Sequence, residues 1–424
     1  MRLRPLAAQL AFLPLLGGLL AGCGRSGDGR THITFWALGA EGEHVAKLIP
    51  GFSALHPEID VRVQIIPWNA AHEKLLTAFA GQSLPDMCQL GNTWIPEFRT
   101  LNTIENLTPW VGASTALRDT SYFPGIWDTN VIDSLVYGIP WYVDTRVLFY
   151  RSDLLSAAGY SSPPRSWEEW FDCSSKMQKR FPGTYANFFS TNNEWAPPVI
   201  LGLQKGSSLL KENNTLGNFS GPEFTSAMHA FYAFFRNGWA PVKTAQIVSV
   251  YQAFAEGFFA MYITGPWYIG EFKNRLPDTL QSVWMTAPLP GPDGGIGTSL
   301  AGGSSLVMFS QSKQKQAVWS LIEYLSRPEE QLEFYRLTGD LPARVVVWRD
   351  SALASNRYAA AFFAQLNHVR ATPKVPEWEQ IAQKVREYVE LITMDQLAVD
   401  EGLRSLDREV NVILEKRRWL LHGR

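Results

Sequence analysis

Hydrophobic residues in the first third of the chain recur with the periods of alternating strands and helices. Short apolar or alternating runs predict strands at residues 33–36, 59–65 and 86–90. Between them, a helical period over 44–55 predicts a helix that Pro50 kinks or splits, and a second helix is expected at 72–80, capped by Gly81. This strand–helix order predicts a parallel, doubly wound sheet.

The same alternation restarts near residue 147. Apolar runs predict strands at residues 147–150, 258–263 and 306–309. Ser166 and Glu169 have capping-box spacing and predict a helix that ends near Arg180. Further helices are expected at 314–325, at 328–339 and through a C-terminal segment with a 3.6-residue period at Leu403, Leu406, Val410, Ile413 and Leu414. We therefore expect two α/β lobes, with a ligand site at strand C-termini and between the lobes.

The N-terminus carries a separate apolar pattern. Arg2 and Arg4 precede a run without charge over 6–20, which is typical of a secretory signal and too short for a membrane span. The residues that follow, Leu20-Ala21-Gly22-Cys23, resemble the bacterial lipobox, in which the cysteine thiol is lipidated and becomes the new N-terminus. A plain signal peptide with a chance cysteine is the alternative. We expect a signal peptide at 1–22 and a lipid-anchored tether at 23–30, which places the mature protein outside the cytoplasmic membrane.

Composition narrows the class of protein. With 46% hydrophobic and 18% charged residues, the chain is globular, and its length suits two to three domains. A formal net charge of −2 without a basic stripe argues against a nucleic-acid partner. The basic cluster Lys416-Arg417-Arg418 lies at the C-terminal end of a predicted helix, where its interaction with the helix dipole explains it. Cys88 and Cys173 could form a disulfide, but we favour two buried free thiols. The 16 tryptophans exceed ordinary core needs and suit a sugar, whose C–H faces stack on indole rings.

Enzyme motifs are missing from the sequence. The chain has no Gly-x-Ser-x-Gly elbow, no His-Glu-x-x-His segment and no phosphate loop, and its seven histidines do not cluster at metal spacing. We therefore expect no catalytic residue, no cofactor and no metal. An exported glycosidase, which needs two carboxylates facing each other across the scissile bond, and a lipid-anchored adhesion protein remain as alternatives to a receptor.

A series of landmarks, in order along the chain, carries a resemblance to a known family. The most specific is Tyr137–Leu155, and the others are residues 33–36, 39–43, 56–59, 84–86, 289–291, 302–303, 323–329 and 341–344. In these segments the chain resembles the extracellular solute-binding proteins of ATP-binding-cassette importers, in the group that binds oligosaccharides such as maltose or trehalose. The resemblance implies a monomer that closes around a small-molecule sugar and docks on the permease, in the periplasm if the cell is Gram-negative.

The resemblance also implies where the lobes divide. It implies a type II periplasmic-binding-protein-like fold of two discontinuous lobes, joined by crossings near 143–146, 300–302 and 348–351. The N-terminal lobe is then 31–142 with 301–349, and the C-terminal lobe is 143–300 with 350–424.

The same comparison implies a set of ligand-binding residues. They are Glu41 or Glu43, Asn92, Trp94, Tyr142, Asp144, Trp267, Gly303 beside Gly302, Ser304 and Arg344. Each has a structural alternative: local backbone bonds for Asp144, a helix dipole for the glutamates, the core for Trp94 and a surface salt bridge for Arg344. Trp68, Trp195 and Trp378 are weaker candidates, and either Trp141 or Tyr142 is expected to stack on the ligand.

The charges of these candidates indicate the ligand. Several acceptors and one candidate cation point to a neutral polyhydroxylated molecule, with a maltose- or trehalose-like α-glucoside favoured. Another polyol or a glycerol-phosphate-type ligand is the alternative. Asn92 stands where relatives often carry an acidic residue, so the substrate can differ from theirs.

Overall fold

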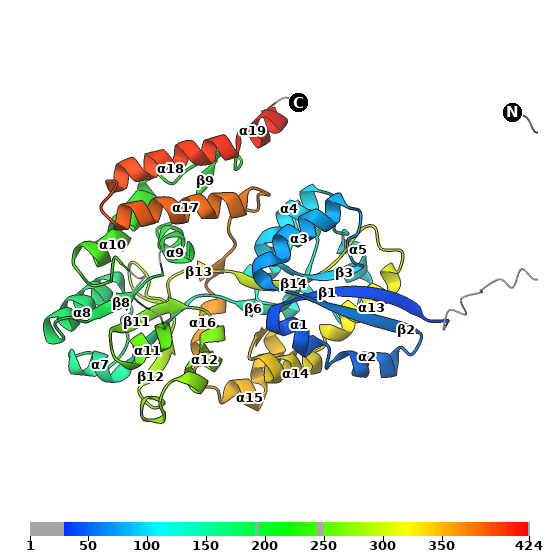
Figure 1. Cartoon of the computed structure of the whole chain (residues 1–424), viewed down its shortest axis with the longest axis horizontal. Helices are drawn as coiled ribbons and strands as arrows, with labels where there is room; N and C mark the ends of the chain where they lie inside the picture. Colours follow the sequence, from blue (N-terminus) through cyan, green and yellow to red (C-terminus); the bar gives the residue numbers. More distant parts are fainter. Residues whose placement is uncertain (1–28, 191–193, 244–246, 248, 423–424) are drawn as a thin grey trace, which may run out of the picture.

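Two lobes lie side by side in the computed structural model, which describes residues 29–190, 194–243, 247 and 249–422 (Figure 1). The predicted signal peptide and Cys23 lie outside the described residues. Each lobe is built around its own sheet, so the predicted α/β class with two lobes is confirmed. No helix in the described part of the chain is long and apolar enough to cross a membrane.

The N-terminal lobe contains a six-stranded sheet. Its strands, in spatial order, are β15 (Leu341–Pro342), β6 (Ile139–Asp144), β14 (Gly302–Met308), β3 (Met87–Gly91), β1 (Thr31–Leu38) and β2 (Ile59–Ile66). Strand β1 pairs in parallel with β2 and β3, as predicted, but β14 runs antiparallel to both β3 and β6. The difference arises because β14 enters this sheet directly from the other lobe, without a helical crossover of its own.

Helices surround this sheet. They are α1 (Gly39–Val45), α2 (Ile49–Leu55), α3 (Trp68–Ala80), α4 (Ile95–Thr100), α5 (Thr108–Ala113), α6 (Pro124–Asp128), α13 (Lys315–Leu325) and α14 (Pro328–Thr338). The helical period over 44–55 does split in two, and Pro50 lies in the first turn of α2, where its missing N–H costs no hydrogen bond. Gly339 ends α14 in the left-handed conformation with φ 82°.

The C-terminal lobe contains a smaller mixed sheet. Its strands are β12 (Trp284–Ala287), β7 (Val147–Arg151), β11 (Phe259–Thr264) and β8 (Tyr185–Phe188), of which only the β11–β8 pair is parallel. Its helices are α7 (Ser152–Ala157), α8 (Trp167–Arg180), α9 (Ala196–Gln204), α10 (Pro222–Arg236), α11 (Val250–Ala255), α12 (Trp267–Arg275), α15 (Ser351–Ala354) and α16 (Ala359–Leu366). Ser166 caps α8 by accepting a bond from the Glu169 N–H at 3.1 Å, while the Glu169 carboxylate turns back to the Arg165 N–H.

Two long C-terminal helices and a short one complete this lobe. Helices α17 (Trp378–Thr393) and α18 (Val399–Ile413) lie side by side across the top of Figure 1, and α19 (Glu415–His422) ends the chain. Three two-stranded ladders remain: β4–β5 (Val131–Ile132 and Leu135–Val136), β9–β10 (Leu210–Lys211 and Leu216–Gly217) and β13–β16 (Ser299–Leu300 and Val369–Arg370). Cys88 and Cys173 are buried free thiols, as predicted, and burial raises the pKa of both.

The chain passes between the two sheets at three places. Strand β6 leads into β7 over residues 144–147, and β13 leads into β14 over 300–302. The third passage follows the short 3-10 helix η4 (Val345–Arg349) into α15. These passages bring the ends of β6 and the start of β14 together at the boundary between the lobes.

Candidate functional site

A cavity of about 600 Å³ opens between the lobes at the edge where the central strands meet. Strands β1, β3 and β6 end at this edge, and the antiparallel β14 begins there. Side chains that follow or occupy these strand ends therefore converge on one space. They include the predicted residues Glu41, Asn92, Trp94, Tyr142, Asp144, Gly303 and Ser304.

Tyr142 is the centre of a hydrogen-bond network that joins four strands. Its hydroxyl donates to Glu41 Oε1 at 2.9 Å and accepts from Gln89 Nε2 and Ser304 Oγ, each at 3.1 Å. Gln89 in turn accepts from the Leu38 N–H at 2.8 Å. Burial, and secondly the nearby Glu41 carboxylate, raise the pKa of Tyr142 well above its ordinary value. The phenol therefore stays protonated and fixes the orientation of Glu41 at the cavity wall.

Trp68, a weaker candidate, lies beside Glu41. Its Nε1 donates to both Glu41 carboxylate oxygens at 3.2 Å, and 36% of the residue remains exposed. The indole ring lies over Gly39, where an added Cβ would be 2.4 Å from Trp68 Cδ1 and where φ is +56°. Glycine at this position thus makes room for a tryptophan that faces the cavity.

Gly303 has a structural reason for lacking a side chain, in addition to the predicted close approach of the backbone to a ligand. It lines the cavity with φ +125°, and an added Cβ would come within 2.3 Å of the Tyr142 carbonyl oxygen. Its lack of a side chain lets β14 pair with β6, and Ser304 next to it is 2% exposed and bonded to Tyr142. Both residues line the cavity and hold β14 against β6 there.

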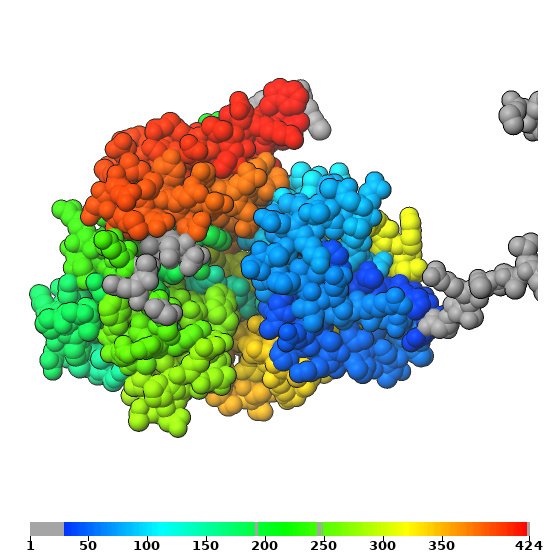
Figure 2. Space-filling model, in the orientation of Figure 1, coloured from blue at the N-terminus to red at the C-terminus, as the bar shows by residue number. Residues whose placement is uncertain are grey.

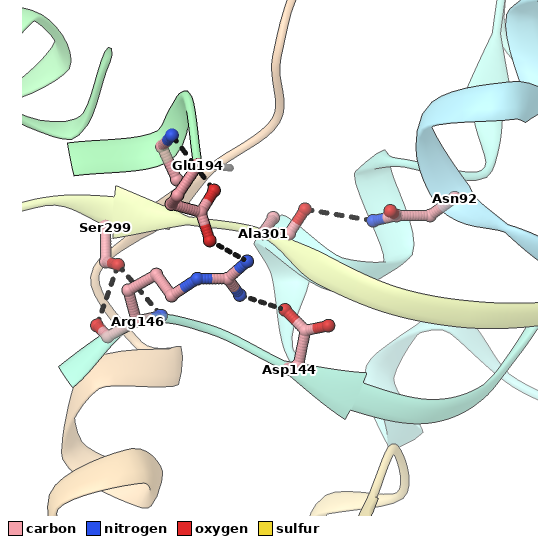
Figure 3. A network of polar contacts seen from close by, with 7 residues as sticks. Asn92, Asp144, Arg146, Glu194, Ser299 and Ala301 are labelled. Atoms are coloured by element: carbon pink, nitrogen blue, oxygen red, sulfur yellow. Dashed lines mark hydrogen bonds and ion pairs between the residues drawn. The ribbon is translucent and has the colours of Figure 1, made fainter. Parts of the chain in front are cut away.

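Asp144 belongs to a polar network at the passage between the lobes (Figure 3). Arg146 donates to Asp144 Oδ1 at 3.1 Å and to Glu194 Oε2 at 3.2 Å, and its main-chain N–H and C=O both bond Ser299 Oγ. Burial raises the pKa of Asp144, although the Arg146 charge opposes that rise. For Arg146, the charges of Glu194 and Asp144 outweigh the opposing effect of burial and raise the pKa. The second Asp144 oxygen has no part in this ion pair, so it can accept from a ligand.

Trp267 forms the opposite wall. It begins α12, is 43% exposed, and lies with its ring 4.7 Å from the Arg146 guanidinium. Trp195 lines the same cavity from the start of α9 and packs edge-on against the buried Trp378. The cavity therefore has exposed indole surface on both lobes, which suits a ligand with apolar faces and polar edges.

Asp340 reaches the cavity from the loop after α14. Burial raises its pKa to about 7, and the Glu41 carboxylate contributes in the same direction, whereas a hydrogen bond with Thr338 opposes the rise. Arg146 is the one cationic side chain among the described residues of the lining, and it is already paired with two carboxylates. Excess acceptors favour a ligand that donates many hydrogen bonds and carries no negative charge.

Asn92 and Thr93 line the cavity directly after the end of β3. Asn92 is 8% exposed, and its amide donates to the Ala301 carbonyl at 2.9 Å (Figure 3). Thr93 Oγ1 donates across the lobes to Glu379 Oε1 at 2.6 Å. Trp94 packs edge-on against Trp68 and also lines the cavity, so it is not a plain core residue.

The structure does not bring two of the predicted residues to the cavity. Glu43 is exposed on α1 and is absent from the lining, which leaves Glu41 as the glutamate of that pair. Arg344 is 8% exposed and donates to the carbonyls of Ala116 and Ser326, with its guanidinium beside the Tyr122 ring. Arg344 therefore supports the interior of the N-terminal lobe, and neither a ligand contact nor the alternative surface salt bridge describes it.

Several lining residues besides Trp68 were missed or undervalued by sequence reasoning. Arg146, Asp340 and Glu379 come from a lobe passage, a loop and a distant helix, and Trp195 precedes α9. Arg146 had a usable signal, because it follows Asp144 by two residues in the most specific landmark segment. Trp141 is the core member of its pair, fully buried against Phe334, while Tyr142 faces the cavity.

Comparisons with known proteins identify similar chains. The family model described as bacterial extracellular solute-binding protein matches residues 36–332. The solved sugar-binding protein MalE from Xanthomonas citri is 46% identical, with a TM-score of 0.90, over 93% of this chain and all of that one. A lipoprotein of Streptomyces antibioticus without assigned function is 27% identical over 85% of this chain and 83% of its own. The diacetylchitobiose binding protein DasA of Streptomyces coelicolor is 22% identical over 84% of this chain and 83% of its own.

Among the described residues, no group of three or more His, Cys, Asp or Glu is arranged to hold a metal ion.

Proposed function

Because the chain belongs to the family of bacterial extracellular solute-binding proteins, we propose that it captures a neutral oligosaccharide and delivers it to an ATP-binding-cassette permease. The observation that carries this proposal is the pairing of exposed indole rings with hydrogen-bond acceptors around one cavity. Trp68 and Trp267 offer apolar faces from opposite lobes, and Glu41, Asp144 and Asp340 offer oxygens between them. Sugars match this combination, since their ring faces are apolar and their edges are hydroxyls.

A maltose- or trehalose-like α-glucoside is the ligand we favour. The similar protein from Xanthomonas citri is named MalE and sugar-binding, whereas DasA is named for diacetylchitobiose, so relatives differ in their sugars. The paired state of Arg146 speaks against a glycerol-phosphate-type ligand, because a phosphate would have to compete with Asp144 and Glu194 for the guanidinium. A neutral polyol other than an α-glucoside is the second candidate.

The chain belongs to a family of binding proteins and its structural neighbours are binding proteins as well, so it is a receptor and not a glycosidase. Two of the carboxylates around the cavity hold and orient neighbouring side chains. Glu41 is bonded by Tyr142 and Trp68, and Asp144 by Arg146.

We propose that the two lobes close on the sugar about the chain passages. In this proposal the N-terminal lobe comprises 31–142 and 301–349, and the C-terminal lobe comprises 143–300 and 350–424. Arg146 is well placed at the hinge, because it bonds Ser299 beside the neighbouring passage, Asp144 at the end of β6 and Glu194 in the C-terminal lobe. A sugar that contacts both lobes would favour the closed form.

The mature protein is proposed to be a monomer held at the outer side of the cytoplasmic membrane. Cys23 would carry the lipid and residues 24–30 the tether, and the similarity to a named lipoprotein supports this. Lipid anchoring keeps the receptor near its permease, and stable attachment requires more than one acyl chain.

Thermal shift and tryptophan fluorescence against a ligand panel test this function. The panel is maltose, trehalose, sucrose, maltotriose and glycerol phosphate, with the sugar recovered and analysed afterwards. We expect at least one neutral glucoside to raise the melting temperature and change the emission, and to be recovered intact. Response to glycerol phosphate alone, or breakdown of the sugar, would contradict the proposal.

A further inference from the structure

Helix α19 and the end of α18 carry a cluster of exposed apolar side chains. Trp419, Leu420 and Leu421 of α19 are all exposed, and so is Val412 in the last turn of α18. Trp419 and Val412, at 72% and 68%, are the most exposed large apolar side chains among the described residues. In Figure 2 this red end of the chain projects from the top of the molecule. Large apolar side chains gathered on the surface of a folded protein indicate that another surface docks there.

Cationic side chains alternate with the apolar ones along a single stripe. The Leu414 N–H donates to the Val410 carbonyl and the Arg418 N–H to the Leu414 carbonyl, each at 2.9 Å, so the helical spacing continues from α18 into α19. Residues four apart therefore share a face across the junction. The exposed residues with this spacing, which we call the α18–α19 stripe together with the adjoining Trp419, are Arg404, Arg408, Val412, Lys416 and Leu420.

The other two cations of α19 turn toward the body of the lobe. Arg418 donates to two main-chain carbonyls at 3.1 and 3.3 Å, and one of them belongs to Asn411 in the last turn of α18. Burial raises the pKa of Glu377 and the charge of Arg417 opposes that rise, so Arg417 lies near the start of α17. The expected role of a helix C-terminus thus describes Arg418 alone. Lys416 lies in the first turn of α19, where the helix dipole disfavours a cation, so its exposed charge has a use outside the helix.

The size and the charge of the stripe select among possible occupants. A stable interface between proteins needs about 800 Å² from each partner. Four partly exposed side chains supply less, since even the largest, a tryptophan, is of a kind that buries roughly 150–250 Å². A helix with Trp and Leu beside Lys and Arg is suited instead to the headgroup boundary of a bilayer. There the apolar side chains enter the acyl region and the cations meet anionic headgroups.

We propose that the α18–α19 stripe binds the surface of an anionic membrane, with Trp419 and Leu420 at the headgroup boundary and Arg408 and Lys416 against the lipid headgroups. This contact lies outside the cleft and goes beyond the proposed function. A lipid on Cys23 holds the protein near the bilayer but leaves its orientation free, whereas a second contact from the C-terminal lobe fixes the face that is turned to the membrane.

The proposed contact is weak and reversible. A single acyl chain binds a bilayer with an association constant of only about 10⁴ M⁻¹, and one short helix end with a few apolar side chains does not exceed that. The stripe therefore orients a protein that the lipid already holds, and it does not keep the protein in the membrane fraction when Cys23 is replaced.

Vesicle titration of the mature protein carrying Cys23→Ser tests this inference without the lipid anchor. The vesicles contain phosphatidylglycerol mixed with phosphatidylcholine in one series and phosphatidylcholine alone in the other, at up to millimolar lipid, and bound protein is measured by sedimentation. We expect at least about tenfold tighter binding to the anionic vesicles, because each cation near an anionic surface contributes about fivefold. Raised salt should reduce the difference between the two series.

Matched variants locate the contact on the protein. Trp419→Ala should lower the affinity for anionic vesicles by about tenfold. Leu421→Ala should lower it several-fold, whereas Leu55→Ala should not, although the two leucines are 53% and 55% exposed and Leu55 lies on α2 of the N-terminal lobe. Lys416→Gln should lower the affinity by about fivefold, and Lys313→Gln, at an exposed lysine of the N-terminal lobe, should leave it unchanged.

Four results would overturn the membrane contact. They are no binding to anionic vesicles at millimolar lipid, equal affinity for neutral and anionic vesicles, equal losses in Leu421→Ala and Leu55→Ala, and self-association in sedimentation velocity that Trp419→Ala abolishes. The last result would assign the stripe to a second copy of this chain. Failure of the proposed function has a different signature, because sugar binding would then be absent in calorimetry while vesicle binding persists.

Discussion

Replacing Asp340 by asparagine should stabilise the ligand-free protein, and more at pH 8 than at pH 5. Burial and the neighbouring Glu41 raise the pKa of Asp340 from 3.8 to about 7. The folded state therefore holds the proton more tightly than the unfolded state does. Stability falls as the pH rises from about 4 to about 7 and then levels off, because above pH 7 the folded protein carries the buried charge.

The size of the effect follows from the two pKa values. At 1.36 kcal/mol per pKa unit, the rise of the Asp340 pKa from 3.8 to about 7 lowers the free energy of unfolding by at most about 4 kcal/mol at pH 8. At pH 5 the same relation gives about 1.5 kcal/mol, since only the unfolded state has lost most of its proton. Asp340→Asn should thus gain roughly 2–3 kcal/mol more at pH 8 than at pH 5.

Thermal unfolding of the variant and the unmodified protein at both pH values measures this difference. For a folded body of about 390 residues, the entropy of unfolding is about 0.8 kcal/mol/K, so the additional gain at pH 8 is about 3 °C if the lobes unfold together. Asp293→Asn is the control, because Asp293 is exposed in a turn outside the cleft. Equal stability changes at both pH values, or destabilisation that grows with pH, would refute the reasoning.

Trp267→Ala should weaken sugar binding by about 1–3 kcal/mol in calorimetry, as loss of an aromatic anchor, while Trp419→Ala, 72% exposed and outside the cleft, should leave affinity unchanged; equal effects would remove Trp267 from the site. Asp144→Asn should weaken binding and lower the unfolding free energy by roughly 1–3 kcal/mol, because its ion pair is lost; unchanged affinity would leave Asp144 a purely structural role. Arg344→Met should lower the unfolding free energy in denaturant by about 1–3 kcal/mol, because the buried Ser326 carbonyl loses its donor and the Ala116 carbonyl loses a hydrogen bond; a loss of affinity in the folded variant would return Arg344 to the site. Cys23→Ser should move the protein from the membrane fraction to the soluble fraction with unchanged sugar affinity, and retention in the membrane would exclude lipidation at Cys23.

Local sequence signals predicted those parts of the fold that depend on neighbouring residues. Pro50 marked the split between α1 and α2, and Ser166 marked the start of α8, because caps and proline act within one helical turn. The period-2 and 3.6 patterns located the strands and helices that they predicted within a few residues, but gave no prediction for β8, β12, α9 and α10. The antiparallel insertion of β14 was missed, since pairing between distant strands leaves no trace in the local pattern.

The candidate site also combines residues that local sequence signals located with residues that only the fold brings together. Glu41, Asn92 and Asp144 follow or end strands, so the edge rule for open sheets placed them correctly in space. Asp340 and Glu379 join them from segments roughly 200–340 residues away in sequence, and only the fold shows that they meet. The landmark around Arg344 indicated a nearby position but not the direction of its side chain, which turns into the lobe interior.

We expect the cleft to capture a neutral oligosaccharide and to release it unchanged. Titration calorimetry of the soluble mature protein with maltotriose, followed by chromatography of the recovered sugar, tests it most directly. We expect saturable binding of one sugar per chain, lost or strongly weakened in Trp267→Ala, with maltotriose recovered unchanged. No heat with any neutral oligosaccharide, or conversion of maltotriose to shorter sugars, would contradict it.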